Sequence, residues 1–321
     1  MPIKNSDPTG GTPAASTSSA ASDAAFPESS PVAPPTPSPT FAPASSGHVW
    51  FVGAGPGDPE LLTLKARRII AEADLVLYAG SLVPPQVVAC ARPDARVIDS
   101  APLTLEQTHA LLRETALAGG MAARVHTGDP SLYGTVREQM RLLHAEGIAC
   151  SVVPGVTAAF AAAAAAGVSF TVPEVTQSLV ITRLEGRTPV PDAERLRELA
   201  RHGSAMAVYL SAAAPERLEE ELAAAGVAPH TPVLAAHRVG WPDQALAWTT
   251  AGGLAGTVRE HGFSRQTVFL VLPGEAAGAT ESRLYAADFA HGWRTNAATG
   301  SAGQNGPDRQ NGQSGQAGSV G

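Results

Sequence analysis

Cysteine is scarce in this chain, because Cys90 and Cys150 are the only two among 321 residues. Two cysteines cannot form a disulfide framework or a thiolate zinc site, so we expect a reducing, cytoplasmic location. The N-terminus lacks the charged-then-apolar pattern of a secretory signal, and we therefore expect no secretion. The nine histidines show no metal-ligand spacing, so we expect no metal site.

Long apolar runs are also missing. No run of about 18 strongly apolar residues exists, and the alanine-rich stretch at 158–166 is too short and too weakly hydrophobic to cross a bilayer. Charged residues make up 16% of the chain and the formal net charge is -7. A nucleic-acid binder needs a basic face to neutralise phosphates. We therefore expect neither a membrane nor a nucleic acid as partner, although a local basic pocket stays possible.

The two ends of the chain differ in composition from the middle. Residues 1–47 are rich in proline, serine and alanine, and residues 295–321 are mainly glycine, glutamine, asparagine and serine. Such segments cannot bury enough apolar surface to offset the entropy lost on ordering. We expect both ends to be disordered and the folded part to span 48–294.

The first half of the folded part alternates strand and helix patterns. Strands are predicted at 49–52, 75–78, 96–99, 122–125 and 149–153, and helices at about 62–72, 105–118, 135–144 and 158–166. Alternation of this kind is typical of an α/β domain with a parallel sheet. The pattern predicts an N-terminal domain at 48–170 with a doubly wound parallel sheet.

In the second half, strands outnumber helices. Strands are predicted at 178–183, 205–210, 232–237, 245–249 and 266–272, and helices at about 193–202, 215–225 and 254–261. This predicts a C-terminal α/β domain at 171–294 with a mixed sheet. In a protein with two such domains, the expected ligand site is the cleft between them.

Two glycine-bearing turns stand directly after predicted strands. The first, at 53–58, is similar to a dinucleotide fingerprint, but Asp58 stands where the third glycine belongs and Pro56 has no amide to offer a pyrophosphate. An oxidoreductase that binds NAD or FAD is therefore disfavoured. The second turn runs from His126 to Pro130. Gly128 permits a close ligand approach there, and the carboxyl ends of parallel strands are where α/β folds bind ligands. The alternative is an ordinary turn closed by Asp129.

Taken together, several turns at strand ends are similar to one family. They are Gly53 to Asp58, Tyr78 to Val83, His126 to Gly134 with Glu138 and Gln139, Pro154 to Ala158, and Leu179 to Pro189. The turns resemble the class III tetrapyrrole methyltransferases, the enzymes of corrin and porphyrin biosynthesis that use S-adenosyl-L-methionine. Three of the stretches, at 77–83, 126–139 and 182–189, resemble most the members that methylate carbon 11 of precorrin-4. The likeness extends over about 48–294, including Ser282 to Tyr285.

The resemblance implies a homodimer in which each chain binds S-adenosyl-L-methionine between its two α/β domains, largely through main-chain groups. It carries the cofactor contacts onto matching positions of this sequence, which are Pro56, Thr127, Gly128, Asp129, Leu132, Thr157, Ala158, Leu210 and Val239. For Leu132 and Leu210, core packing is the alternative. The implied activity is methylation of carbon 11 of precorrin-4, or of its cobalt form, in cobalamin biosynthesis.

The implied substrate is a polycarboxylate, and arginine suits carboxylates because its guanidinium can donate two parallel hydrogen bonds. Our candidates for substrate contacts are Arg183, Arg187 and Arg238, with Ser81 as a further donor. We expect Arg67, Arg68 and Arg137 on solvated helix faces. No catalytic residue is assigned, because methyl transfer from a sulfonium depends mainly on the alignment of donor and acceptor.

Other interpretations fit the same motifs. One is a sister methyltransferase that acts on uroporphyrinogen III or on another precorrin carbon. Another is a module that binds the cofactor without turnover. The motifs do not tell whether the substrate contains cobalt.

Overall fold

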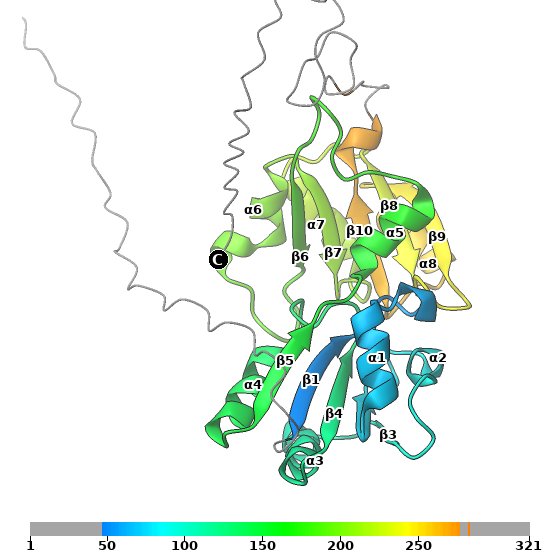
Figure 1. Ribbon diagram of the computed structural model, residues 1–321. Coiled ribbons are helices and arrows are strands. Elements are labelled where there is room, and N and C mark those ends of the chain that lie inside the picture. The colour runs from blue at the N-terminus through cyan, green and yellow to red at the C-terminus, as the bar shows by residue number, and fades with distance from the viewer. Residues whose placement is uncertain (1–46, 277–281, 283–321) are drawn as a thin grey trace, which may run out of the picture. The chain divides into compact units, whose positions relative to one another are not determined.

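The computed structural model describes residues 47–276 and Ser282. The two tails expected to be disordered lie outside the described residues apart from Gly47, and so does the Ser282 to Tyr285 stretch apart from Ser282. Within the described part, the strands form two five-stranded sheets, one from each half of the chain (Figure 1).

The first sheet is entirely parallel, with the strand order β3-β2-β4-β1-β5. Phe51 and Val52 of β1 point to opposite faces, and both are fully buried. Burial on both faces is what a parallel strand covered by helices requires, and the predicted parallel sheet is confirmed. The strands are β1 (His48–Gly53), β2 (Leu75–Tyr78), β3 (Arg96–Asp99), β4 (Met121–His126) and β5 (Ala149–Val153).

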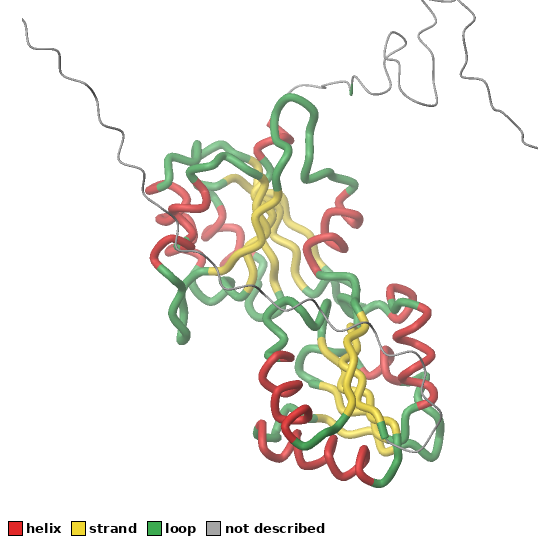
Figure 2. The backbone as a smooth tube through the Cα atoms, turned by 60° about the vertical axis from the view of Figure 1, so that its left-hand side comes forward, coloured by secondary structure: helices red, strands yellow, loops and turns green. Residues whose placement is uncertain are grey.

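Helices cover both faces of this sheet (Figure 2). Thr104 caps α3 in a reciprocal pair with Gln107, as expected for a threonine before a helix with glutamine at its third position. The sequence missed α2, a single turn that begins at a proline. The helices are η1 (Pro59–Leu61), α1 (Leu64–Glu72), α2 (Pro85–Val88), α3 (Leu105–Leu117) and α4 (Val136–Ala145).

The second sheet is mixed, as predicted, with the order β6-β7-β10-β8-β9. β6 and β7 are parallel, while β10 runs antiparallel to both β7 and β8, and β9 runs antiparallel to β8. The strands are β6 (Leu179–Arg183), β7 (Ala205–Tyr209), β8 (Pro232–His237), β9 (Ala245–Thr250) and β10 (Thr267–Val271).

One face of the second sheet is covered by α6 (Leu196–Ala200), α7 (Pro215–Ala224) and α8 (Leu254–Glu260). The helix predicted at 193–202 is wrong in its extent. The chain instead forms the 3-10 helix η2 (Asp192–Glu194), and Arg195 then takes an extended conformation with ψ 141° before α6 begins. A further 3-10 helix, η3 (Pro273–Ala276), follows β10.

The alanine-rich helix α5 (Ala158–Ala166) covers the other face of the second sheet. Its Ala159 and Ala162 are fully buried, among small residues that include Ala207 of β7. Alanine lets a helix approach a sheet closely because its side chain is small. We expected the boundary between the two domains near residue 170, which is after α5. The packing instead changes from the first sheet to the second between β5 and α5.

Candidate active site

Loops from three strands meet at the carboxyl edge of the first sheet. Gly55 and Gly128 exchange hydrogen bonds, with the Gly128 amide 2.8 Å from the Gly55 carbonyl and the Gly55 amide 3.2 Å from the Gly128 carbonyl. A Cβ atom on Gly155 would collide with the Gly128 carbonyl oxygen. Glycine is needed here because the main chains of the loops after β1, β4 and β5 touch one another.

Asp129 fastens two of these loops together. Its Oδ1 accepts from the Ser131 amide at 2.8 Å, and its Oδ2 accepts from the Gly155 amide at 2.9 Å. The first bond is the turn-closing contact of an Asx turn, the alternative role considered for this residue. The second bond reaches across to the loop after β5, so this carboxylate holds the shape of the site.

The main chain beside Asp129 is available to a ligand. Thr127 is exposed, and its amide and carbonyl make no hydrogen bond to any other residue in 47–276. Gly128 follows in the left-handed region with φ 61°. A bound molecule can therefore reach free main-chain donors and acceptors at the end of β4.

Tyr209 joins the end of β7 to the start of α5. Its hydroxyl lies 2.5 Å from Thr157 Oγ1 and accepts from the Ala159 amide at 2.8 Å. Burial raises the pKa of the Tyr209 phenol, which therefore stays protonated. The sequence did not single out Tyr209, although its position before Leu210 at a strand end was a signal that could have found it.

Two large side chains near this point are exposed and have a strained main chain. Leu210 has φ 52° and is 70% exposed, while Tyr133 has φ 56° and is 44% exposed. Bulky residues rarely adopt the left-handed region, and such strain clusters at functional sites. The Tyr133 ring centroid lies 6.0 Å from that of Tyr209. Tyr133, Tyr209 and Leu210 thus present apolar surface beside Thr157.

The loop after β1 packs on the loop after β8. A Cβ on Gly57 would meet the Trp241 ring at 2.5 Å, and one on Gly240 would meet Pro56 Cγ at 3.1 Å. Val239 precedes Gly240 but is only 6% exposed and packs in the core with α5. Pro56 and the main chain around Val239 are therefore neighbours, while the Val239 side chain faces the core.

The predicted substrate arginines differ in how free they are. Arg183 donates to the carbonyls of Leu184, Thr188 and Pro189 at 3.0–3.3 Å, so its guanidinium closes the loop after β6. Arg187, within that loop, is exposed and has no ion pair with the rest of the described chain.

Arg238 and Ser81 are linked through Gln266. Arg238 Nε lies 2.9 Å from Asp243 Oδ1, and its guanidinium lies 4.1 Å from the Trp241 ring centroid. Its amide donates to the Gln266 carbonyl, while Gln266 Nε2 donates to the Ser81 carbonyl, both at 2.8 Å. The exposed Ser81 side chain makes no hydrogen bond to the described residues.

Most of the predicted site residues thus lie in two groups in the structure. Thr127, Gly128, Asp129, Thr157 and Leu210 gather around the ends of β4, β5 and β7, with Leu132 and Ala158 half-buried beside them. The second group comprises Pro56, Ser81, Val239 and Arg238, on the loops linked through Gln266 and Trp241. In the described ranges, no group of three or more His, Cys, Asp or Glu side chains could hold a metal ion.

His126, the last residue of β4, sits directly beneath the Thr127 turn. Its side chain is 8% exposed and its Nε2 has no hydrogen-bond partner within the described structure. Burial, reinforced by the charge of Arg124, lowers the pKa of His126 to about 3. The imidazole is therefore neutral at physiological pH.

Comparison with known proteins relates this arrangement to one family. Residues 48–255 match the tetrapyrrole (corrin/porphyrin) methylases. Over 252 residues the chain is 41% identical to a cobalt-precorrin-4 C(11)-methyltransferase of Priestia megaterium, covering 77% of this chain and 97% of that protein. It is 43% identical to a precorrin-4 C(11)-methyltransferase of Pseudomonas aeruginosa, covering 77% of this chain and 98% of that protein.

Solved structures agree with the sequence comparison. A cobalt precorrin-4 methyltransferase is 42% identical, with a TM-score of 0.68 over 70% of this chain and 93% of the other. A uroporphyrin-III C-methyltransferase from Thermus thermophilus, solved with S-adenosyl homocysteine, is 28% identical, with a TM-score of 0.59 over 70% of this chain and 92% of the other. This chain belongs to the tetrapyrrole (corrin/porphyrin) methylase family.

Proposed function

We propose that this protein transfers a methyl group from S-adenosyl-L-methionine to carbon 11 of precorrin-4 or cobalt-precorrin-4, giving the corresponding precorrin-5 in cobalamin biosynthesis. One observation carries the proposal. Relatives named for this reaction are 41% and 43% identical to the chain over nearly their whole length. One of these relatives is named for cobalt-precorrin-4 and the other for precorrin-4, so the proposal includes both forms of the substrate.

The loops at the ends of β4 and β7 fit the methyl donor. Free main-chain groups at Thr127 suit the polar parts of an amino acid or a ribose, and the exposed Leu210 side chain offers an apolar contact. Glycines 55, 128 and 155 keep the loops close together and leave their edge without side chains. The proposed cofactor contacts are Pro56, Thr127, Gly128, Asp129, Leu132, Thr157, Ala158, Leu210 and Val239, with Val239 acting only through its main chain.

S-adenosyl-L-methionine supplies a methyl group on a sulfonium, which is already an activated leaving group. The protein therefore has to hold donor and acceptor in line and exclude water, and such positioning accounts for a large share of the rate. The Gly55–Gly128 bonds and the two bonds of Asp129 fix the loops that do this. We assign no general acid or base.

The substrate carries several carboxylates, and we propose that Arg187, Arg238, Arg183 and Ser81 contact them. Arg187 is the most available of the three arginines, because it is exposed and has no ion pair with another described residue. Arg183 already donates to three carbonyls and acts mainly by shaping the loop that carries Arg187. An Arg187 variant should therefore weaken substrate binding without disturbing the loop.

We further propose a homodimer in the cytoplasm that has neither a nucleic acid nor a membrane as partner. The homodimer is the assembly implied by the family resemblance, and the scarcity of cysteine suits a reducing compartment. Across the residues that the structure describes, no helix is long and apolar enough to cross a membrane.

A turnover assay tests the function directly. The purified protein is incubated with S-adenosyl-L-methionine and enzymatically made precorrin-4, with and without cobalt, and the product is followed by mass spectrometry and carbon NMR. One added methyl group at carbon 11 is the expected result. Methylation of uroporphyrinogen III, or at another carbon, would replace the proposed acceptor. Cofactor binding without any methylated product would show that the protein is a module that binds the cofactor without turnover.

A further inference from the structure

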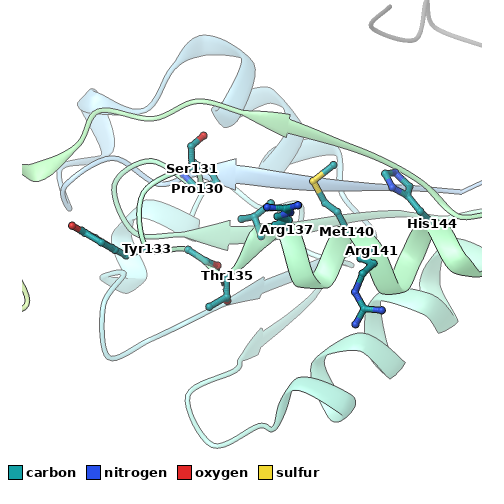
Figure 3. Close-up of a pocket in the computed structure, with 10 residues that line it drawn as sticks. Pro130, Ser131, Tyr133, Thr135, Arg137, Met140, Arg141 and His144 are labelled. Carbon is teal, nitrogen blue, oxygen red and sulfur yellow. Dashed lines mark hydrogen bonds between the residues drawn. The ribbon is translucent and has the colours of Figure 1, made fainter. Parts of the chain in front are cut away.

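A hollow of about 720 Å³ runs along α4 (Figure 3). It is lined by the loop that follows β4 and by side chains of the helix, and none of the assigned cofactor or substrate contacts lies in it. Its lining includes Tyr133, Arg137, Met140, Arg141 and His144. The first of these side chains lies at one end of the hollow and the last at the other.

The hollow carries positive charge without matching acids. Arg137 and Arg141 lie one helical turn apart, and neither forms an ion pair with an acid of the described chain. Arg113 of the neighbouring helix α3, in contrast, pairs with Glu146 just beyond α4. Arg137 and Arg141 are therefore free to bind an anion, since both residues are exposed.

The hollow begins at the candidate active site. Tyr133 lines its end, and the same ring lies 6.0 Å from the ring of Tyr209. Tyr209 is paired with Arg183 in the register between β7 and β6. Burial raises the pKa of the Tyr133 phenol, and the nearby charge of Arg183 offsets part of that rise. A molecule bound beside Leu210 can thus extend past Tyr133 onto α4.

The start of α4 faces the same end. Thr135, in the N-cap position, has φ 53° and makes no side-chain capping bond. The first amides of α4 therefore add the partial positive charge of a helix N-terminus to that of the two arginines. The positive charge along α4 favours a carboxylate that enters from the active site.

We propose that the hollow along α4 binds carboxylate arms of the tetrapyrrole substrate, with Arg137 and Arg141 as its cationic groups. The proposal rests on the proposed function, which supplies a polycarboxylate substrate. A chain with a net charge of -7 repels such a substrate at long range. Unpaired arginines next to the site offset that repulsion where the arms must dock. Arg137 lies on an exposed face of α4, as expected, and the proposal adds a role in binding.

The test compares two double variants with the same change in charge. R137Q/R141Q removes the arginines of the hollow, while R67Q/R68Q removes two exposed arginines of α1 that also have no ion pair in the described structure. The probe is uroporphyrin III, a stable tetrapyrrole with acetate and propionate arms, titrated by absorbance. We expect about three- to tenfold weaker binding for R137Q/R141Q only, as for loss of two exposed ion pairs.

High salt should shrink that difference, because exposed charges are screened. Equal dissociation constants for both double variants would overturn the proposal. Calorimetry with S-adenosyl-L-methionine confirms that each variant is folded, and the single variant R141Q repeats the comparison if the double variant is not. Precorrin-4 turnover by the unmodified protein tests the proposed function separately. Its absence would refute that function, whereas the uroporphyrin titration would still decide on the hollow.

Discussion

The hydroxyl groups of Tyr209 and Thr157 lie 2.5 Å apart, although 52 residues separate them in the chain. The Ala159 amide donates to the same phenol oxygen, while in the contact between Tyr209 and Thr157 either hydroxyl can be the donor. Tyr209 therefore supplies the cap that Thr157 does not give α5 through its own side chain. This single phenol connects β7 to the helix that follows the Pro154–Thr157 turn.

Replacing Tyr209 with phenylalanine should remove this cap and keep the ring. The Ala159 amide then loses its partner, and we expect a loss of about 1–2 kcal/mol in the free energy of unfolding. Affinity for S-adenosyl-L-methionine should fall as well, because Thr157 is freed to move. Urea denaturation and calorimetry measure the two effects. Tyr78→Phe is the control, since that phenol makes no hydrogen bond within the described part. Equal effects of the two variants would contradict the assignment.

Gly155→Ala should separate the three loops of the site. The new methyl group would collide with the Gly128 carbonyl, which is main chain and cannot rotate away. We expect cofactor affinity to fall at least about tenfold, with a loss of about 1–3 kcal/mol in stability. Gly256→Ala is a matched control in α8, where a Cβ meets nothing within 4 Å. That change should stabilise the helix by up to about 1 kcal/mol. A fully active Gly155→Ala protein would show that the loops are not held as described.

Tyr133→Asn should separate stability from function. Tyrosine at φ 56° is strained, whereas asparagine tolerates this region better. Relief of about 1 kcal/mol of strain should roughly offset the lost packing of a ring that is already 44% exposed. The melting temperature should change little, while the KM for the tetrapyrrole should rise about fivefold through loss of aromatic contact. Tyr133→Phe keeps the ring and should leave that KM nearly unchanged. A large loss of stability with an unchanged KM would assign Tyr133 a purely structural role.

The ten strands could be predicted from the sequence because most of them are short apolar runs bounded by turn residues, as Val49 to Val52 illustrates. The sheet that α5 covers could not be predicted from the sequence. A helix of eight alanines and one phenylalanine is apolar on every side and has no distinct apolar stripe, so its sequence does not tell which sheet it packs on. The break at Arg195 could not be predicted for a related reason, because a single extended residue leaves little trace in periodicity.

In the candidate site, too, some features could be predicted from the sequence and others could not. The turns that contain Gly128 and Gly155 could be predicted, because a glycine directly after a strand indicates a tight turn or a close approach of the main chain. The left-handed conformations of Tyr133 and Leu210 were not foreseeable, since nothing local favours them in bulky residues. The contact between Tyr209 and Thr157, the double role of Asp129 and the carbonyl contacts of Arg183 depend on how distant loops meet.

His126 should make the protein less stable as the pH falls. Its folded pKa of about 3 lies below the ordinary histidine value of 6.5, because burial disfavours the charged form. Between these values the unfolded chain binds a proton that the folded chain does not, so stability decreases with falling pH by up to about 1.4 kcal/mol per unit. His126→Asn should remove this contribution and flatten the pH dependence of urea unfolding between about pH 6 and 4. His230→Asn controls for the loss of an exposed imidazole. If His126→Asn and the unmodified protein lose stability in parallel over this range, His126 is not held neutral beneath the Thr127 turn.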